Sequence, residues 1–130
     1  MTGFEAATLY IGLSVIVMMG LKLNAGRVRA GAKVSIGDGG NEALQRAMRT
    51  QANAVEDVPI ALIGLLALAS LSAPVALIHG LGGSFVAARA LHGLGMGGAK
   101  GLGWGRMVGT MGTMLVMLTT AGSCLWFALA

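Results

Sequence analysis

Charged side chains are scarce in this sequence of 130 residues, of which Asp, Glu, Lys and Arg make up 11%. A soluble globular domain carries about 25% charged residues, because water has to wet its surface. The scarcity therefore excludes an ordinary soluble domain. It does not indicate disorder, since 55% of the chain is hydrophobic and the mean hydropathy is +0.79, whereas disordered segments combine low hydrophobicity with high charge.

Several kinds of site are excluded because their residues are missing. The single cysteine, Cys124, allows no internal disulfide and, lying in an apolar stretch, says nothing about the redox compartment. His79 and His92 lie 13 residues apart without Cys or acidic partners on their faces, so no metal site is expected. No Ser/His/Asp or Cys/His arrangement is present, and Gly37–Gly40 lacks the Lys-Ser/Thr of a phosphate-binding loop.

Long apolar runs are abundant, and a membrane-spanning helix needs about 20 mostly apolar residues. We expect one domain over residues 1–130 with four spans, at about 4–23, 44–71, 75–94 and 107–130. The first span lacks the basic start and the cleavage site of a signal peptide, and a polar helical extension should follow it through Lys33. The expected fold class is all-α, an integral membrane four-helix bundle, in which the 22 glycines allow close helix packing.

The distribution of Lys and Arg predicts the orientation of these spans. The first and third connections with their flanks carry all nine basic residues, and the second connection and both termini carry none. By the positive-inside rule, the first and third connections are cytoplasmic and both termini lie outside. The same distribution argues against a nucleic-acid partner despite the net charge of +4, because the basic residues border apolar runs instead of lining one face. They are Lys22, Arg27, Arg29, Lys33, Arg46, Arg49, Arg89, Lys100 and Arg106.

Smaller signals mark the ends and faces of the expected helices. Asn41 is suited to cap the second helix. Part of the Gly-rich segment from Gly93 to Gly105 is expected to be loop, and the alternative is a helix whose every fourth residue is glycine, which would form a continuous face of small residues. A row of methionines at helical spacing on the fourth span favours core packing, with lining of a substrate cavity as the alternative. These are Met107, Met111, Met114 and Met117.

Five polar side chains share one face of the second predicted helix. They are separated by 4, 3, 4 and 3 residues, which stacks them on one side at about 3.6 residues per turn. The face runs into the apolar segment that starts at Val58. A charged side chain at membrane depth costs about 2.5–3.5 kcal/mol, so these groups should pair or face an internal cavity. They are Glu42, Arg46, Arg49, Asn53 and Glu56.

Three interpretations of this stripe stay open. Its charges could be satisfied by neighbouring helices and only hold the bundle together, or they could protrude into the cytoplasm and be solvated. The third interpretation is a pocket for an anionic, peptide-like ligand, in which Arg49 holds carboxylates and Asn53 and Glu56 take an amide and an ammonium group. Pro59 favours a pocket, because it frees the carbonyl of Val55 and kinks the helix beside the stripe.

The third and fourth spans add further polar groups at the same end. Arg89 and His92 are three residues apart and share one helical face, whereas His79 is expected to be a hydrogen-bonded packing residue. Arg106 opens the fourth helix, where it could also extend to lipid headgroups.

These residues carry a resemblance. Three segments carry it, in order along the chain: the loop Gly37–Gly40, then Arg49-x-Gln51-x-Asn53-x-x-Glu56-x-x-Pro59, and then Arg89-x-x-His92. Together they resemble the MAPEG family, the membrane-associated proteins of eicosanoid and glutathione metabolism. The likeness covers nearly the whole chain and is strongest to small bacterial members. It implies a four-helix subunit, a homotrimer, and glutathione bound between subunits near the cytoplasmic surface of the bacterial inner membrane.

The resemblance also assigns roles to single residues. Glutathione binding would involve Arg27 (contributed to the neighbouring subunit), Arg49, Asn53, Glu56, Arg89 and His92, and the catalytic group that approaches the thiol would be Arg106. Two positions depart from the family, because Asp57 and Met96 stand where many members have aromatic residues. The usual hydroxyl contacts to glutathione are therefore missing.

The expected function is that of a membrane-bound glutathione transferase or peroxidase. Arg106 would lower the pKa of the glutathione thiol, and small apolar electrophiles or lipid hydroperoxides would enter from the bilayer. The alternative is a non-catalytic membrane protein, either a lipid-binding scaffold or a small transporter subunit. Acidic residues interleaved with arginines favour an anion site over a proton-coupled cation pathway.

Overall fold

The computed structural model describes residues 1–97 and 103–130, and in this part of the chain all regular structure is α-helical. The helices are α1 (Gly3–Ala32), α2 (Glu42–Ser70), α3 (Val75–Gly97) and α4 (Gly103–Leu129). The expected all-α four-helix bundle is confirmed. The Gly-rich connection is partly helical, since α3 and α4 extend into it from both sides, and its centre with Lys100 lies outside the described residues.

Capping interactions explain where the first two helices begin. The Thr2 hydroxyl accepts a hydrogen bond from the Glu5 amide at 3.2 Å, and the Glu5 carboxylate accepts one from the Thr2 amide at 2.7 Å. This reciprocal pair is a capping box. The Asn41 side chain accepts from the Leu44 amide at 2.9 Å, which confirms the expected cap of α2. The polar extension of α1 is also confirmed, because the helix ends only at Ala32, before Lys33 in the left-handed conformation.

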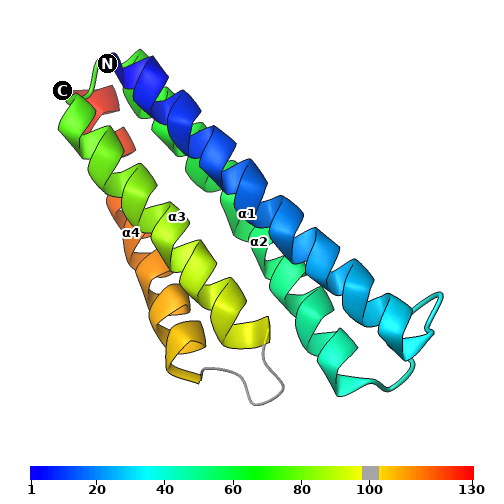
Figure 1. Ribbon diagram of the computed structural model, residues 1–130. Coiled ribbons are helices and arrows are strands. Elements are labelled where there is room, and N and C mark those ends of the chain that lie inside the picture. Colours follow the sequence, from blue (N-terminus) through cyan, green and yellow to red (C-terminus); the bar gives the residue numbers. More distant parts are fainter. Residues whose placement is uncertain (98–102) are drawn as a thin grey trace.

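The four helices run alternately up and down as two hairpins (Figure 1). Both termini lie at one end, and the α1–α2 connection lies at the opposite end. The hairpin of α1 and α2 diverges from the hairpin of α3 and α4 toward that opposite end. Among the described residues α1 contacts α2 and α3 but not α4, so the outer face of α4 remains uncovered by this chain.

The apolar core lies near the end that carries the termini, and large apolar side chains also cover the outside. Phe85, Leu65 and Leu68 are among the fully buried residues. Of the described helices, α1, α2 and α4 are long and apolar enough to cross a membrane. The α3 helix is not among these three, because His79, Arg89 and His92 lower its hydropathy, and a third span at 75–94 stays a prediction.

The methionine row on α4 does not pack in the core of this chain. Met107, Met111 and Met114 are exposed, and only Met117 packs against the core. The core interpretation was therefore wrong for three of the four. An apolar outer face is what lipid or another subunit would cover, and helical spacing alone does not distinguish it from a core face.

Glycine brings α3 and α4 into close contact. A Cβ atom at Gly109 would lie 2.5 Å from the His92 amide nitrogen and 2.6 Å from the Ala88 carbonyl oxygen, so only glycine fits at this crossing. On the other side of α3, the Tyr10 ring lies directly against Gly82, and its hydroxyl is 2.8 Å from His79 Nδ1. His79 is thus the hydrogen-bonded packing residue that the sequence predicts.

We predict that Gly109→Ala destabilises the bundle by about 1–3 kcal/mol, the usual cost of overpacking, because the new methyl group would push against the backbone of α3. The matched control is Gly122→Ala on the same helix, where a Cβ atom meets no described atom within 4 Å. Its higher helix propensity should make it neutral or more stable by about 1 kcal/mol. Thermal unfolding in detergent measures both, and equal stabilities would refute the close crossing.

Candidate functional site

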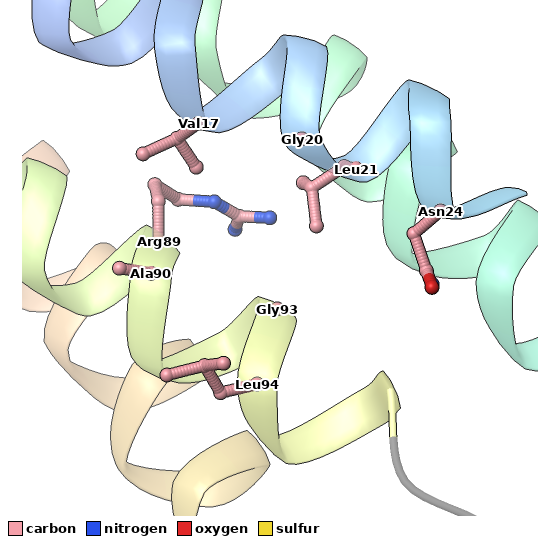
Figure 2. Close-up of a pocket in the computed structure, with 8 residues that line it drawn as sticks. All are labelled: Val17, Gly20, Leu21, Asn24, Arg89, Ala90, Gly93 and Leu94. Carbon is pink, nitrogen blue, oxygen red and sulfur yellow. The ribbon is translucent and has the colours of Figure 1, made fainter.

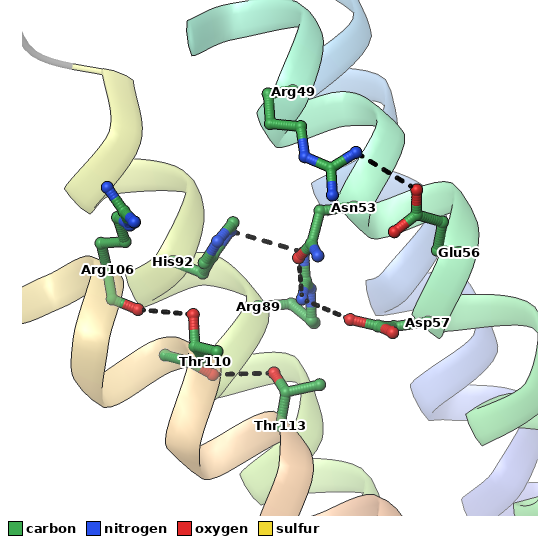
Figure 3. Close-up of polar contacts among 10 residues, drawn as sticks. Arg49, Asn53, Glu56, Asp57, Arg89, His92, Arg106, Thr110 and Thr113 are labelled. Carbon is green, nitrogen blue, oxygen red and sulfur yellow. Dashed lines mark hydrogen bonds and ion pairs between the residues drawn. The ribbon is translucent and has the colours of Figure 1, made fainter.

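The polar face of α2 is divided into separate ion pairs. Glu42 and Arg46 are 3.8 Å apart, and Arg49 and Glu56 are 3.5 Å apart. The side chains of Arg49 and Glu56 are 66% and 55% exposed, so in the single chain they lie on the surface and contact each other. Asn53 lies on the same helix between them and points toward α3 (Figure 3).

Arg89 forms the centre of a buried polar cluster. Its side chain is 2% exposed, and its Nη1 donates to Asn53 Oδ1 at 2.9 Å and to Asp57 Oδ2 at 3.1 Å. Its Nη2 lies 3.5 Å from His92 Nδ1 (Figure 3). A buried guanidinium is tolerated only when it is paired and hydrogen-bonded, so Asp57 and Asn53 are what allow Arg89 to lie inside the bundle.

His92 and Arg106 lie on the α3–α4 side of this cluster. His92 is 5% exposed and packs at the crossing with Gly109. Its Nδ1 faces Arg89, a donor, which favours the tautomer that carries the proton on Nε2. Arg106 lies near the start of α4 with an exposed side chain, and its backbone carbonyl accepts from Thr110 at 2.9 Å. In Figure 3, His92 lies between Arg106 and Asn53.

The structure brings together most, but not all, of the residues that the sequence singled out. Asn53, Arg89 and His92 form one hydrogen-bonded cluster, and Arg49, Glu56 and Arg106 flank it. Arg27 is apart from it: the side chain is exposed and donates to Asn24 Oδ1, 3.2 Å away on its own helix. Within a single chain Arg27 therefore makes no contact with the cluster.

Two residues have roles that the sequence analysis missed. Asp57, which stands where the resemblance leads one to expect an aromatic residue, is the ion-pair partner of Arg89. Its spacing of four residues from Asn53 was the signal that could have revealed it, since both then lie on one helical face. Arg29 donates to the carbonyls of Val34 and Gly37 at 3.3 and 2.8 Å, which ties the α1–α2 connection to the end of α1.

Two cavities adjoin these residues. A groove of about 610 Å³ between α1 and α2 is lined by Lys22, Arg29, Gln51 and Glu56 among others. A second cavity of about 470 Å³ lies between α1 and α3 and reaches Arg89 (Figure 2). Over residues 1–97 and 103–130, no three His, Cys, Asp or Glu side chains gather in a way that could hold a metal ion.

Comparison with known proteins identifies the family to which this helical bundle belongs. The model of the MAPEG family matches residues 7–126, almost the entire chain. The chain belongs to the MAPEG family. This assignment and the apolar helices make it an integral membrane protein, and the resemblance seen in the sequence is confirmed.

The curated relatives of this MAPEG protein include the inner membrane protein YecN from two strains of Escherichia coli, K12 and O6:H1 (CFT073). Each is 35% identical over 86 residues, which is 66% of this chain and 66% of the relative. The match thus spans just under two thirds of the relatives' own length. No solved structure matches the chain.

We predict that Asp57→Ala lowers the free energy of unfolding by about 3 kcal/mol, because removing one partner leaves a buried, uncompensated charge on Arg89. The adjacent substitution Glu56→Ala is the matched control. It breaks a pair whose side chains are both more than half exposed, and such pairs contribute about 0–1 kcal/mol. Unfolding with sodium dodecyl sulfate in mixed micelles measures both variants. Equal losses would contradict a structural role for the Asp57–Arg89 pair.

Proposed function

We propose that this protein is a membrane-bound glutathione-dependent transferase or peroxidase that acts on apolar electrophiles or lipid hydroperoxides. The observation that carries the proposal is the arrangement on α2, α3 and α4, where Arg49, Glu56 and Arg106 surround the Asn53–Arg89–His92 cluster. Family membership supports it, since glutathione is the co-substrate that the resemblance implies.

The exposed Arg49–Glu56 pair is suited to open for a ligand. At 3.5 Å and with both side chains more than half exposed, the pair contributes at most about 1 kcal/mol. A bound tripeptide would replace it at little cost, because the Arg49 guanidinium could hold a carboxylate through two hydrogen bonds. Glu56 could then accept from the ammonium group, and the Asn53 amide could bind a peptide group.

The chemistry requires a thiolate near neutral pH, and Arg106 is the group proposed to stabilise it. A nearby guanidinium favours the charged sulfur over the neutral thiol. In a transfer reaction the thiol proton leaves to water, and the thiolate adds to an activated carbon–carbon double bond of the electrophile. The sulfur–carbon bond forms as the π bond breaks, and the resulting carbanion takes a proton from water. In peroxide reduction, two glutathione molecules give up two electrons and two protons to form a disulfide. The O–O bond breaks, and an alcohol and water result.

A homotrimer would complete the proposed site. Arg27 is exposed on α1 and donates to Asn24 of its own helix, and in the proposed trimer it would contact a neighbouring subunit. The exposed apolar side chains of α4, such as Met111 and Leu118, would face that neighbour or the lipid, and small apolar substrates would enter there. We further propose insertion in a bacterial inner membrane, as the name of the YecN relatives indicates for them, with both termini outside.

A non-catalytic role, as a lipid-binding scaffold or small transporter subunit, is the second candidate. The specific observation in its favour is that the charges on α2 and α3 already pair with one another, Arg49 with Glu56 and Arg89 with Asp57. Pairs of this kind could serve only to hold the helices together. Glutathione binding distinguishes the two candidates.

We predict that the purified protein binds glutathione and that Arg49→Ala weakens binding by a factor of about ten or more, the loss expected for one charged hydrogen bond. Arg46→Ala is the matched control, since Arg46 lies one turn earlier on α2 and pairs with Glu42. It should bind as the unmodified protein does. Isothermal titration calorimetry in detergent measures all three. Absence of binding to the unmodified protein at millimolar glutathione would favour the scaffold.

A second prediction concerns the thiol. In Arg106→Ala, the pKa of bound glutathione should rise toward about 8.5, the value of a free thiol, so that thiolate forms only at higher pH. The ultraviolet absorbance of the thiolate, followed against pH, measures this shift. Arg106→Lys retains the positive charge and should retain most of the lowered pKa. If the alanine variant titrates like the unmodified protein, Arg106 does not activate the thiol.

A further inference from the structure

The cavity between α1 and α3 lies on the other side of Arg89 from His92 and Arg106. Its wall on α1 consists of Val17, Gly20, Leu21 and Asn24, and its wall on α3 includes Gly93 and Leu94. Figure 2 shows the Arg89 side chain extending from α3 into the space between Val17 and Leu21. The volume of about 470 Å³ falls within the roughly 300–1,000 Å³ of small-molecule sites.

One donor of Arg89 has no acceptor in this part of the molecule. Its Nη atoms bind Asn53, Asp57 and His92, but Nε finds no hydrogen-bond partner among the residues that the structure describes. Leaving a buried N–H unsatisfied costs about 1–3 kcal/mol. The side chain is 2% exposed and borders the cavity, so an oxygen atom that reached Nε from the cavity would remove this cost.

The charges around the cavity indicate which kind of oxygen fits. Asp57 already neutralises Arg89 at 3.1 Å, so the cavity offers hydrogen-bond donors without a net positive charge. Asn24 offers a further donor, because its Oδ1 accepts from Arg27 and its amide nitrogen remains for a ligand. A carboxylate would be repelled by Asp57, whereas an uncharged carbonyl oxygen would not. The remaining walls are apolar.

We propose that this cavity binds a membrane glycerophospholipid through the carbonyl oxygen of one acyl ester. The ester accepts from Arg89 Nε, and its acyl chain lies against Val17 and Leu21. The headgroup extends past Asn24 toward the charged end of the bundle, where Lys22 and Arg27 lie. Arg89 lies on α3 between the apolar core and that charged end of the bundle, and the ester groups of a bilayer likewise lie between its hydrocarbon and its charged headgroups.

The glycines of α1 offer a matched pair of variants. At both Gly20 and Gly12, a Cβ atom would meet no described atom within 4 Å, so a side chain can start at either position without a clash at its first carbon. Only Gly20 lines the cavity. Gly20→Leu therefore fills the cavity, and Gly12→Leu adds the same side chain to the same helix outside it.

The experiment incubates delipidated protein in detergent with an equimolar mixture of a diester phospholipid and its diether analogue. The two have the same headgroup and chain length but differ in the carbonyl oxygens and in mass. Native mass spectrometry counts each lipid bound. The unmodified protein and Gly12→Leu should retain about tenfold more ester than ether, as one charged hydrogen bond provides. Gly20→Leu should bind little of either and without preference.

Each other outcome overturns the proposal. Equal retention of ester and ether by the unmodified protein shows that no carbonyl is recognised, and this comparison involves no substitution that could affect folding. Retention of neither lipid would mean that a second copy of the chain or detergent covers the cavity. A preference that survives Gly20→Leu, or disappears in Gly12→Leu, places recognition elsewhere. Glutathione is absent throughout, so the result is independent of the proposed function.

Discussion

The guanidinium of Arg89 is the group on which the polar half of this bundle depends. A charge that is 2% exposed in a membrane protein is stable only with a compensating partner, and that partner is Asp57 at 3.1 Å. The pair joins α2 to α3, and thereby one helical hairpin to the other. Asn53 and His92 are then oriented by the remaining Nη protons of the same side chain.

Close packing at Gly109 of α4 sets the position of the His92 backbone, while Arg89 contacts the His92 ring. The crossing at Gly109 brings α4 against the backbone of His92 and Ala88, so the imidazole is held between a glycine contact and the Arg89 cluster. This fixes where Arg106, one turn before Gly109, lies relative to His92. The geometry of the described polar residues is therefore a consequence of helix packing.

The sequence predicts the features that depend on one helix at a time. Apolar length predicted helices close to the observed bounds, Asn41 was a correct cap, and the spacing of Arg89 and His92 correctly placed them on one face. The rotation of each helix against its neighbours was beyond prediction. Helical periodicity placed Arg49, Asn53 and Glu56 together, but only packing turns Asn53 inward and leaves the other two exposed. For the same reason the exposed methionines of α4 could be mistaken for core residues.

Asp57 determines the charge balance around Arg89 and His92. Asp57 neutralises Arg89, and Glu56 offsets Arg49. Arg106 also lies beside His92, but no carboxylate of the described residues comes within 4 Å of its guanidinium. On the proposed function, the positive potential that stabilises a thiolate would then come from one residue at the start of α4, and not from a diffuse cluster of arginines. In place of the hydroxyl contacts that the resemblance implies, the ion pair of Arg89 with Asp57 would orient Asn53 and His92. A site of this kind depends less on hydroxyl contacts and more on the burial of a single guanidinium.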